Sequence, residues 1–233
     1  MVLKPPPHSS ATRWRHTMGM MPSFRFELRC TGRVAGIDEA GRGPLAGPVF
    51  AAVAIIDRER AKRKLLRMID DSKKLTLDER EEAYETMIAS GIVQFAIAEA
   101  SVDEIDSINI LQATFLAMRR AVQALSEQPE VVLVDGDRVP PLLGCRAETI
   151  VGGDGHSYSI AAASIFAKVA RDRYMHALAI SFPGYGWETN RGYGSAEHLE
   201  ALDRLGPTAH HRRSFAPVTR LLVRDQEAVS SRA

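Results

Sequence analysis

The sequence predicts an α/β or α+β domain in which helices cover the faces of a sheet, and three observations support this. Strand-length runs of apolar character occur at residues 34–38, 48–56, 92–98 and 131–135. Helical patterns separate or follow these runs. The chain has 233 residues, of which 45% are hydrophobic, and this suits one sizeable domain with a substantial core, with two small domains as the alternative.

The first helix is predicted over residues 77–90 from the signals at its two ends. Glu79 follows Thr76 at the spacing of a capping box. The Thr76 side chain can accept from the amide of Glu79, and Glu79 can reach back to the amide of Thr76. Gly91 is expected to end the helix.

Two further helices are predicted, one from apolar spacing and one from small residues. After Ser107, apolar side chains recur at spacings of three and four as far as Leu125, and Pro129 prevents that helix from continuing. The run from Ser159 to Arg173 is rich in alanine. Because small residues allow close approach to a sheet or a helix, we assign the alanines to packing.

The chain is predicted to divide into an arm, a domain and a tail. Residues 1–32 form a basic, disordered arm, residues 33–223 the folded domain and residues 224–233 a flexible tail. Residues 1–33 hold six of the 30 basic side chains and one of the 29 acidic ones, which leaves an acidic body with 24 basic and 28 acidic side chains. If such a body handles nucleic acid, it must use local basic patches and bound cations rather than a global positive field.

The arm contains a run of three prolines and lacks the apolar segment of a secretory signal. Its arginine-rich, acid-poor composition also permits an organelle transit peptide, although prolines oppose the amphipathic helix of such a peptide. Translation from Met18, Met20 or Met21 is a further alternative. The two cysteines are far apart, and the longest apolar run is too short for a membrane span. We therefore expect free thiols, no zinc and a reducing, cytoplasmic location.

Adjacent acidic residues beside a loop rich in glycine and proline are the first chemical signal. Asp38 and Glu39 follow a short apolar strand and precede residues 41–48, which contain three glycines and two prolines. Carboxylates are hard oxygen ligands, and glycine lets the backbone approach a polyanion closely. The stretch therefore predicts phosphate chemistry aided by a divalent cation. A tight turn into the next strand is the alternative.

Two more acids are expected to join this pair. Asp135 ends the strand at residues 131–135, and Asp154 stands between glycines just before the alanine-rich helix. If the strands lie together, the carboxylates meet at one edge, where ligands collect in open α/β sheets. Repulsion among four carboxylates would raise their pKa values unless a divalent cation neutralised them. The cluster therefore implies Mg²⁺ or Mn²⁺.

Several motifs in order resemble the ribonuclease HII family over roughly residues 34–223. The segments that carry the resemblance are Gly36–Val49, Asp71–Leu75, Asn109–Thr114, Val134–Gly136, Ser159–Asp172 and Gly192–Gly194. The resemblance implies the α/β ribonuclease H-like fold, with a mixed sheet of about five strands and a small helical C-terminal region. It also implies endonucleolytic cleavage of RNA in RNA/DNA hybrids and of single ribonucleotides embedded in duplex DNA, leaving 5′-phosphate and 3′-hydroxyl ends.

By this resemblance, two divalent ions would be held and catalysis carried by four acids: Asp38, Glu39, Asp135 and Asp154. The substrate would be bound by Gly41, Arg42, Gly43, Lys73 and Tyr193. The backbone of the loop would sense the ribose 2′-hydroxyl, and the tyrosine would contact the RNA-to-DNA junction. The implied partners are RNA/DNA hybrids and duplex DNA that contains ribonucleotides. We expect a monomer, because no heptad repeat calls for self-association, and no membrane partner.

Other polar residues allow two interpretations each. Lys73 and Lys74 contact phosphates or form a solvated pair, and residues 210–213 contact the duplex backbone or form an ordinary surface. Asp172 has basic neighbours, so we expect it to form a structural ion pair outside the site. Asp137 would point the same way as Asp135 only if the strand continued through a glycine, which is unfavourable.

One residue departs from the family pattern. Where the family usually has a lysine ahead of the fourth acid, this chain has Gly152. Since all four acids are present, we expect activity to survive with a changed rate or metal preference. Two alternatives remain open. The chain could be another two-metal nuclease of the same fold, or a non-catalytic nucleic-acid-binding module, which would gain nothing from gathered carboxylates.

Overall fold

The computed structural model describes residues 21–230 and the side chains of residues 21–224. Across these residues, no helix combines the length and the apolar character that crossing a bilayer requires. In chain order the elements are η1 (Glu27–Arg29), β1 (Val34–Ala40), β2 (Val49–Ile56), α1 (Arg63–Leu66), α2 (Leu77–Ser90), β3 (Val93–Ala100), α3 (Val102–Gln123), β4 (Val131–Asp135), β5 (Arg146–Ile150), η2 (Gly153–Gly155), α4 (Tyr158–Ser181), α5 (Trp187–Asn190), α6 (Ala196–Leu205) and α7 (Ala216–Ser230).

Strand β1 lies at the centre of the sheet that the described residues form, whose order is β3-β2-β1-β4-β5. It runs antiparallel to β2 and parallel to β4. Because Ile37 pairs with Val134, the carboxyl ends of β1 and β4 meet at one edge and bring Asp38 and Asp135 together. The predicted mixed sheet of about five strands is confirmed, as is the expectation that these two strand ends are neighbours.

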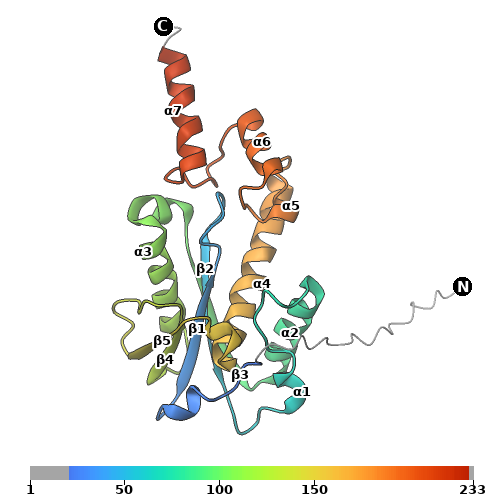
Figure 1. Cartoon of the computed structure of the whole chain (residues 1–233), viewed down its shortest axis with the longest axis vertical. Coiled ribbons are helices and arrows are strands. Elements are labelled where there is room, and N and C mark those ends of the chain that lie inside the picture. The colour runs from blue at the N-terminus through green and yellow to red at the C-terminus, as the bar shows by residue number, and fades with distance from the viewer. Residues whose placement is uncertain (1–20, 231–233) are drawn as a thin grey trace, which may run out of the picture.

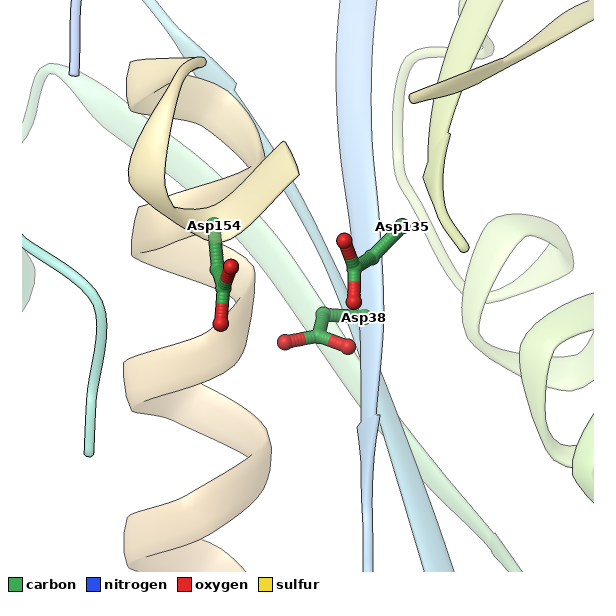
Figure 2. A group of neighbouring side chains, drawn as sticks. All are labelled: Asp38, Asp135 and Asp154. Carbon is green, nitrogen blue, oxygen red and sulfur yellow. The ribbon is translucent and has the colours of Figure 1, made fainter. Parts of the chain in front are cut away.

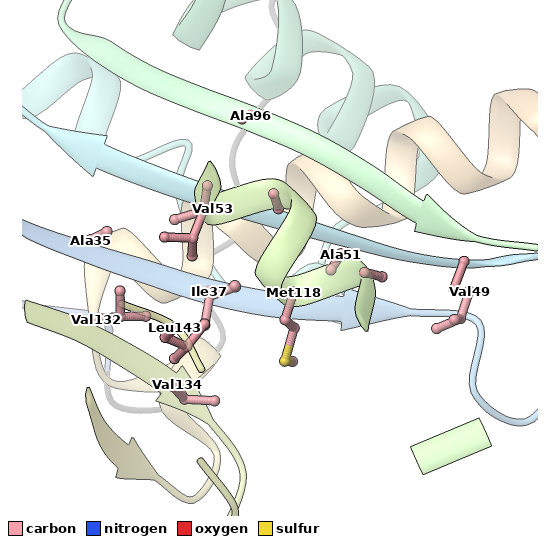
Figure 3. Close-up of a cluster of buried hydrophobic side chains, with 14 of the residues drawn as sticks. Ala35, Ile37, Val49, Ala51, Val53, Ala96, Met118, Val132, Val134 and Leu143 are labelled. Carbon is pink, nitrogen blue, oxygen red and sulfur yellow. The ribbon is translucent and has the colours of Figure 1, made fainter. Parts of the chain in front are cut away.

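Successive residues of β1 face opposite sides of the sheet, and helices cover both sides (Figure 1). Ala35 and Ile37 lie in the core under α3 (Figure 3). On the other side, Gly36 touches α4 so closely that an added Cβ would lie 2.1 Å from the carbonyl carbon of Ser159. The same alternation turns Asp38 toward α4 and the next residue toward α3.

Helix α2 has the predicted bounds and both predicted end signals. The Thr76 hydroxyl accepts from the amide of Glu79 at 3.3 Å, and the Glu79 carboxylate accepts from the amide of Thr76 at 2.8 Å. Gly91 follows the last residue with a φ of 61°, in the left-handed region. The local sequence therefore determines this helix at both ends.

Helix α3 begins earlier than predicted because it consists of two helical segments joined at a kink. Asn109 lies inside it with non-helical angles, a φ of 67° and a ψ of 162°, and its side chain accepts from the amides of Leu111 and Gln112. The first segment has a capping box of its own, formed by Ser101 and Glu104. The apolar spacing after Ser107 described only the second segment.

Helix α4 runs from Tyr158 to Ser181 and extends well beyond the predicted Arg173. Its alanines at 161–163 are fully buried against the sheet, so their packing role is confirmed. Helices α5, α6 and α7 form the small helical region that the resemblance implied. Helix α7 continues to Ser230, so residues 224–230 are helical in this structure, which corrects the predicted tail. The last three residues lie outside the described part.

Residues 21–32 pack against the domain, which corrects the predicted boundary of the disordered arm. Ser23 forms a β-bridge with Ser157, and Glu27 is buried. The Glu27 carboxylate accepts from the Ser157 hydroxyl at 2.7 Å and from the Ser159 amide at 3.0 Å. A carboxylate at the start of α4 stabilises that helix and anchors the segment. The prediction for residues 1–20 lies outside the described residues, as do the alternative starts Met18 and Met20.

Candidate functional site

Three of the four predicted acids converge at the edge of the sheet where β1 and β4 end. Asp38 comes from β1, Asp135 from the last position of β4 and Asp154 from η2. Each offers a carboxylate oxygen, and these oxygens lie within 4.8 Å of one another. Figure 2 shows the three side chains turned toward one another. Closely set, hard oxygen donors of this kind fit a divalent cation.

Backbone amides orient each of these carboxylates. One oxygen of each aspartate accepts a bond: Asp38 from the amide of Glu39 at 2.7 Å, Asp135 from Gly153 at 2.6 Å, and Asp154 from Gly155 at 3.0 Å. The bond to the amide of residue 153 also ties β4 to η2. The cluster is therefore oriented by the backbone before any ligand binds.

Burial and mutual repulsion make the ionised cluster unfavourable by itself. Burial raises the pKa of the Asp38 carboxyl well above its usual value, and the charges of Glu39 and Asp135 raise it further. Burial also raises the pKa of Asp135, and the charge of Asp154 adds to this effect. A bound divalent cation would remove this repulsion, so the electrostatics of the site fit the implied metal.

Glu39, the fourth predicted acid, is close to the cluster but does not belong to the group of three. Its side chain lies on the α3 side of β1, where its carboxylate accepts from Arg42 at 3.2 Å. The pKa of Glu39 lies above its usual value, because burial and the charge of Asp135 raise it more than Arg42 lowers it. Glu39 therefore interacts electrostatically with Asp135 from the opposite face of the strand.

The predicted substrate-binding residues share one cleft of about 340 Å³ with the acids. Every predicted site residue except Asp154 lines this cleft. Gly41 has a φ of 95°, and an added Cβ on Gly43 would lie 3.4 Å from the ring of Tyr193, so the loop and the tyrosine are in close contact. Tyr193 is 47% exposed and available to a ligand. The tertiary structure thus brings together segments that are more than a hundred residues apart in the sequence.

Lysine side chains stand beside the cluster from the loop before α2. Lys73 donates to Asp154 at 3.0 Å, while Lys74 donates to Asp70 at 3.0 Å. Partial burial lowers the pKa of Lys73, but its bond to Asp154 outweighs this and the pKa lies above the usual value. The two lysines therefore differ, since only Lys73 reaches the candidate metal ligands.

Ser164 is a residue of this site that the sequence analysis did not single out. It lies on α4, where its hydroxyl is 2.8 Å from that of Ser72, and its interaction with the Asp38 carboxyl opposes the rise in the pKa of that group. Its only signal in the sequence was a hydroxyl within a run of alanines, which also suits plain packing.

Four residues or segments fall outside the cluster. Asp172 pairs with Lys168 at 2.7 Å, as expected of a structural ion pair. Asp137 is exposed beside Arg138. Both interpretations of residues 210–213 were wrong for two of the four residues, because His211 and Arg212 are fully buried. Gly152 has a φ of 65° and open space around its missing Cβ.

Comparisons with known proteins find similar sequences and a similar fold. A family model described as Ribonuclease HII matches residues 35–218. The chain is 58% identical over 204 residues to ribonuclease HII of Rhodospirillum rubrum, covering 88% of this chain and 93% of that protein. It is also 58% identical over 203 residues to ribonuclease HII of Paramagnetospirillum magneticum, covering 87% and 100%. The crystal structure of ribonuclease H2 from Pyrococcus horikoshii matches with a TM-score of 0.68 and 28% identity, covering 83% of this chain and 99% of that one.

Proposed function

The chain belongs to the ribonuclease HII family and is a ribonuclease H, and on this premise we propose that it cuts RNA/DNA hybrids and also cuts 5′ of single ribonucleotides in duplex DNA. The observation that carries the proposal is one cleft lined by Asp38, Asp135, the glycine loop and Tyr193. A site that combines carboxylates with close backbone approach suits a ribose phosphate. The cellular role we propose is removal of ribonucleotides during DNA replication and repair.

We assign the binding of two divalent cations, Mg²⁺ or Mn²⁺, to four acids: Asp38, Glu39, Asp135 and Asp154. Support comes from the close approach of the three aspartates and from the interaction of Glu39 with Asp135. The chemistry that the cations supply when bound is activation of a water for in-line attack on the phosphodiester and stabilisation of the departing 3′ oxygen, which gives 5′-phosphate and 3′-hydroxyl ends. The four carboxylates would hold the cations in place, and no side-chain nucleophile is needed.

We assign recognition of the ribose to the loop at Gly41, Arg42 and Gly43 and to Tyr193. Glycine allows the loop backbone to approach the sugar, and a hydrogen bond to the 2′-hydroxyl separates RNA from DNA at one position. The exposed ring of Tyr193 beside Gly43 supports its stacking on the sugar or base at the junction. Arg42, half exposed and bonded to Glu39, would approach the same nucleotide.

We assign a phosphate contact to Lys73, which is exposed over most of its side chain. Its position beside Asp154 supports retained activity despite Gly152, because a cation from another segment already stands next to the fourth acid. We also propose that the protein is a monomer. The two free cysteines support a reducing, cytoplasmic compartment.

The proposal is tested with a labelled DNA duplex that contains one ribonucleotide, incubated with Mg²⁺, Mn²⁺ or EDTA beside an all-DNA duplex. We expect a metal-dependent cut on the 5′ side of the ribonucleotide and an intact control. Cleavage of the all-DNA duplex would instead indicate another nuclease of this fold. If the protein binds the duplex but does not cleave it with Mg²⁺ or with Mn²⁺, the result would indicate a nucleic-acid-binding module.

A further inference from the structure

Two arginines are buried beneath the glycine loop, and neither forms an ion pair within the described residues. Arg171 on α4 is 1% exposed, and Arg212 in the segment before α7 is 0% exposed. Among the described residues, the guanidinium groups of both arginines donate hydrogen bonds to backbone carbonyls. Because removing a charge from water costs several kcal/mol, a buried guanidinium ordinarily has a carboxylate partner. These two side chains depart from that rule at the edge of the candidate site.

The carbonyls that Arg212 binds all belong to the glycine loop at residues 41–48. Its nitrogens donate to four of them: Gly41 at 2.6 Å, Arg42 at 2.9 Å, Gly47 at 2.9 Å and Pro48 at 3.3 Å. One side chain thus holds both ends of the loop. Since glycine leaves the backbone free to adopt many conformations, bonds from outside the loop are what select one.

Arg171 joins the same loop to the turn that carries Tyr193. It donates to three carbonyls: Ala46 at 3.1 Å, Pro48 at 3.4 Å and Arg191 at 3.0 Å. Its guanidinium carbon lies 6.0 Å from the centre of the Tyr193 ring. An added Cβ on Gly41 would lie 2.0 Å from Nε of Arg171, so the loop rests directly on this side chain.

Both guanidinium groups stay charged at neutral pH. Burial lowers the pKa of Arg171 to about 10 and that of Arg212 to about 9, and the charge of Arg171 lowers the latter further. Two positive charges therefore lie beneath the loop, and no carboxylate among the side chains of residues 21–224 pairs with either of them. Such charges add a favourable potential for a polyanion above them.

Resting on the proposed function, we propose that Arg171 and Arg212 are positioning residues for recognition of the 2′-hydroxyl. Together they set the backbone of residues 41–48 and the turn of Tyr193 in one mutual arrangement. A guanidinium has five donors in a rigid planar fork, and only such a fork reaches several carbonyls at fixed angles. An ammonium group has three donors on a flexible stem, so lysine preserves the charge and loses this geometry.

The test compares Arg212→Lys and Arg171→Lys with the wild type in two measurements. The first is the ratio of the dissociation constants for an all-DNA duplex and for the same duplex with one ribonucleotide, measured by fluorescence anisotropy with Ca²⁺ in place of Mg²⁺. The second is kcat and KM for cleavage in Mg²⁺. We expect the ratio to fall about 10-fold or more, because the loop would no longer be held in the arrangement that binds the 2′-hydroxyl. A misplacement of about 1 Å can lower a reaction rate about 100-fold, which indicates the size of such positional effects.

The control is Arg173→Gln, two positions from Arg171 on the same helix. Arg173 is exposed and forms ion pairs with Glu81 and Glu85 on α2, and neither partner belongs to the glycine loop. This variant should keep the wild-type ratio. Measuring the half-saturating Mn²⁺ concentration in each variant separates the loop from the metal ligands, and we expect it to change less than the ratio does.

A merely structural role would lower the melting temperature and the active fraction, yet leave the binding ratio of the folded protein unchanged. That result in both lysine variants would overturn the inference. A variant that does not fold is replaced by the other, since the two side chains act on the loop from different elements. A wild type that fails to cut at the ribonucleotide would instead contradict the proposed function, so the two failures are distinguishable.

Discussion

Lys73 donates to Asp154 across 3.0 Å, although its own side chain is 77% exposed and that of Asp154 is 7% exposed. The bond joins the loop before α2 to η2, two segments that are not adjacent in the sheet. It occupies Oδ2 of Asp154, and Asp154 is one of the three candidate metal ligands. The ammonium group of Lys73 would therefore compete with a metal ion for Asp154.

Replacing Lys73 by methionine should separate these two roles. We expect the half-saturating Mn²⁺ concentration to fall, because the competing ammonium group is gone. The KM for the duplex should rise if Lys73 makes the proposed phosphate contact. Lys74→Met is the matched control, because that side chain bonds to Asp70 and does not reach the cluster. Unchanged metal dependence in Lys73→Met would contradict the competition.

Asp38→Asn should greatly reduce the cleavage rate while stabilising the metal-free protein. Loss of a central ligand should cost about 4 kcal/mol in the transition state, or about 1000-fold in rate. In EDTA the variant should melt at a higher temperature, because a neutral amide replaces a buried carboxylate that Glu39 and Asp135 repel.

Thermal unfolding with and without Mn²⁺ checks this prediction. The wild type should gain stability from the ion, and Asp38→Asn should gain less. Glu82→Gln, on the exposed face of α2, is the control and should respond to Mn²⁺ like the wild type. A variant that melts below the wild type in EDTA would contradict the proposed repulsion.

Gly36→Ala should be severely destabilising, by about 3 kcal/mol or more, because the new Cβ would lie 2.1 Å from the backbone of Ser159 and force α4 away from β1. Gly91→Ala is a useful comparison. An added Cβ at Gly91 would meet open space, but the backbone φ of 61° is strained for alanine. We therefore expect this substitution to lower the free energy of unfolding by about 1 kcal/mol. Urea unfolding measures both free energies, and equal costs would show that the contact with α4 relaxes.

Buried histidines should make stability fall at acidic pH. The amide of Thr208 donates to Nδ1 of His211, whose Nε2 lies 3.1 Å from Nε2 of His198, an arrangement that requires neutral rings. Burial and the neighbouring histidines lower the pKa of His211 to about 3 from its ordinary 6.5. The unfolded chain therefore binds a proton more readily, and the contribution of His211 is present above pH 6.5 and is lost as the pH falls toward 3.

For each pH unit that the pH falls within that window, His211 should lower the free energy of unfolding by up to about 1.4 kcal/mol. The measurement is the free energy of unfolding in urea at pH 7, 6 and 5. His211→Gln should show a shallower slope than the wild type. His176→Gln, exposed on α4, is the control for the loss of a histidine. A wild-type slope retained in His211→Gln would contradict the assignment.

The segments predicted from sequence were those whose signals are local. Thr76, Glu79 and Gly91 lie within one helix and its ends, and the structure has the same bounds. Strand β5 was missed because its residues, Arg-Ala-Glu-Thr-Ile, are mostly polar and it lies at the edge of the sheet, where burial imposes little pattern. The start of α3 was missed because the kink at Asn109 interrupts its periodicity.

By itself the sequence determined strands β1 to β4, helix α2 and the family to which the chain belongs, because these depend on residue type and spacing. Only the tertiary structure decided that Asp38 joins Asp135 and Asp154 while Glu39 faces α3, and that Arg212 lies under the loop. The reason is that the pairing of β1 with β4, the helix that covers each face of β1 and the burial of Arg212 all depend on contacts between distant segments. No short window of sequence contains both partners of such a contact.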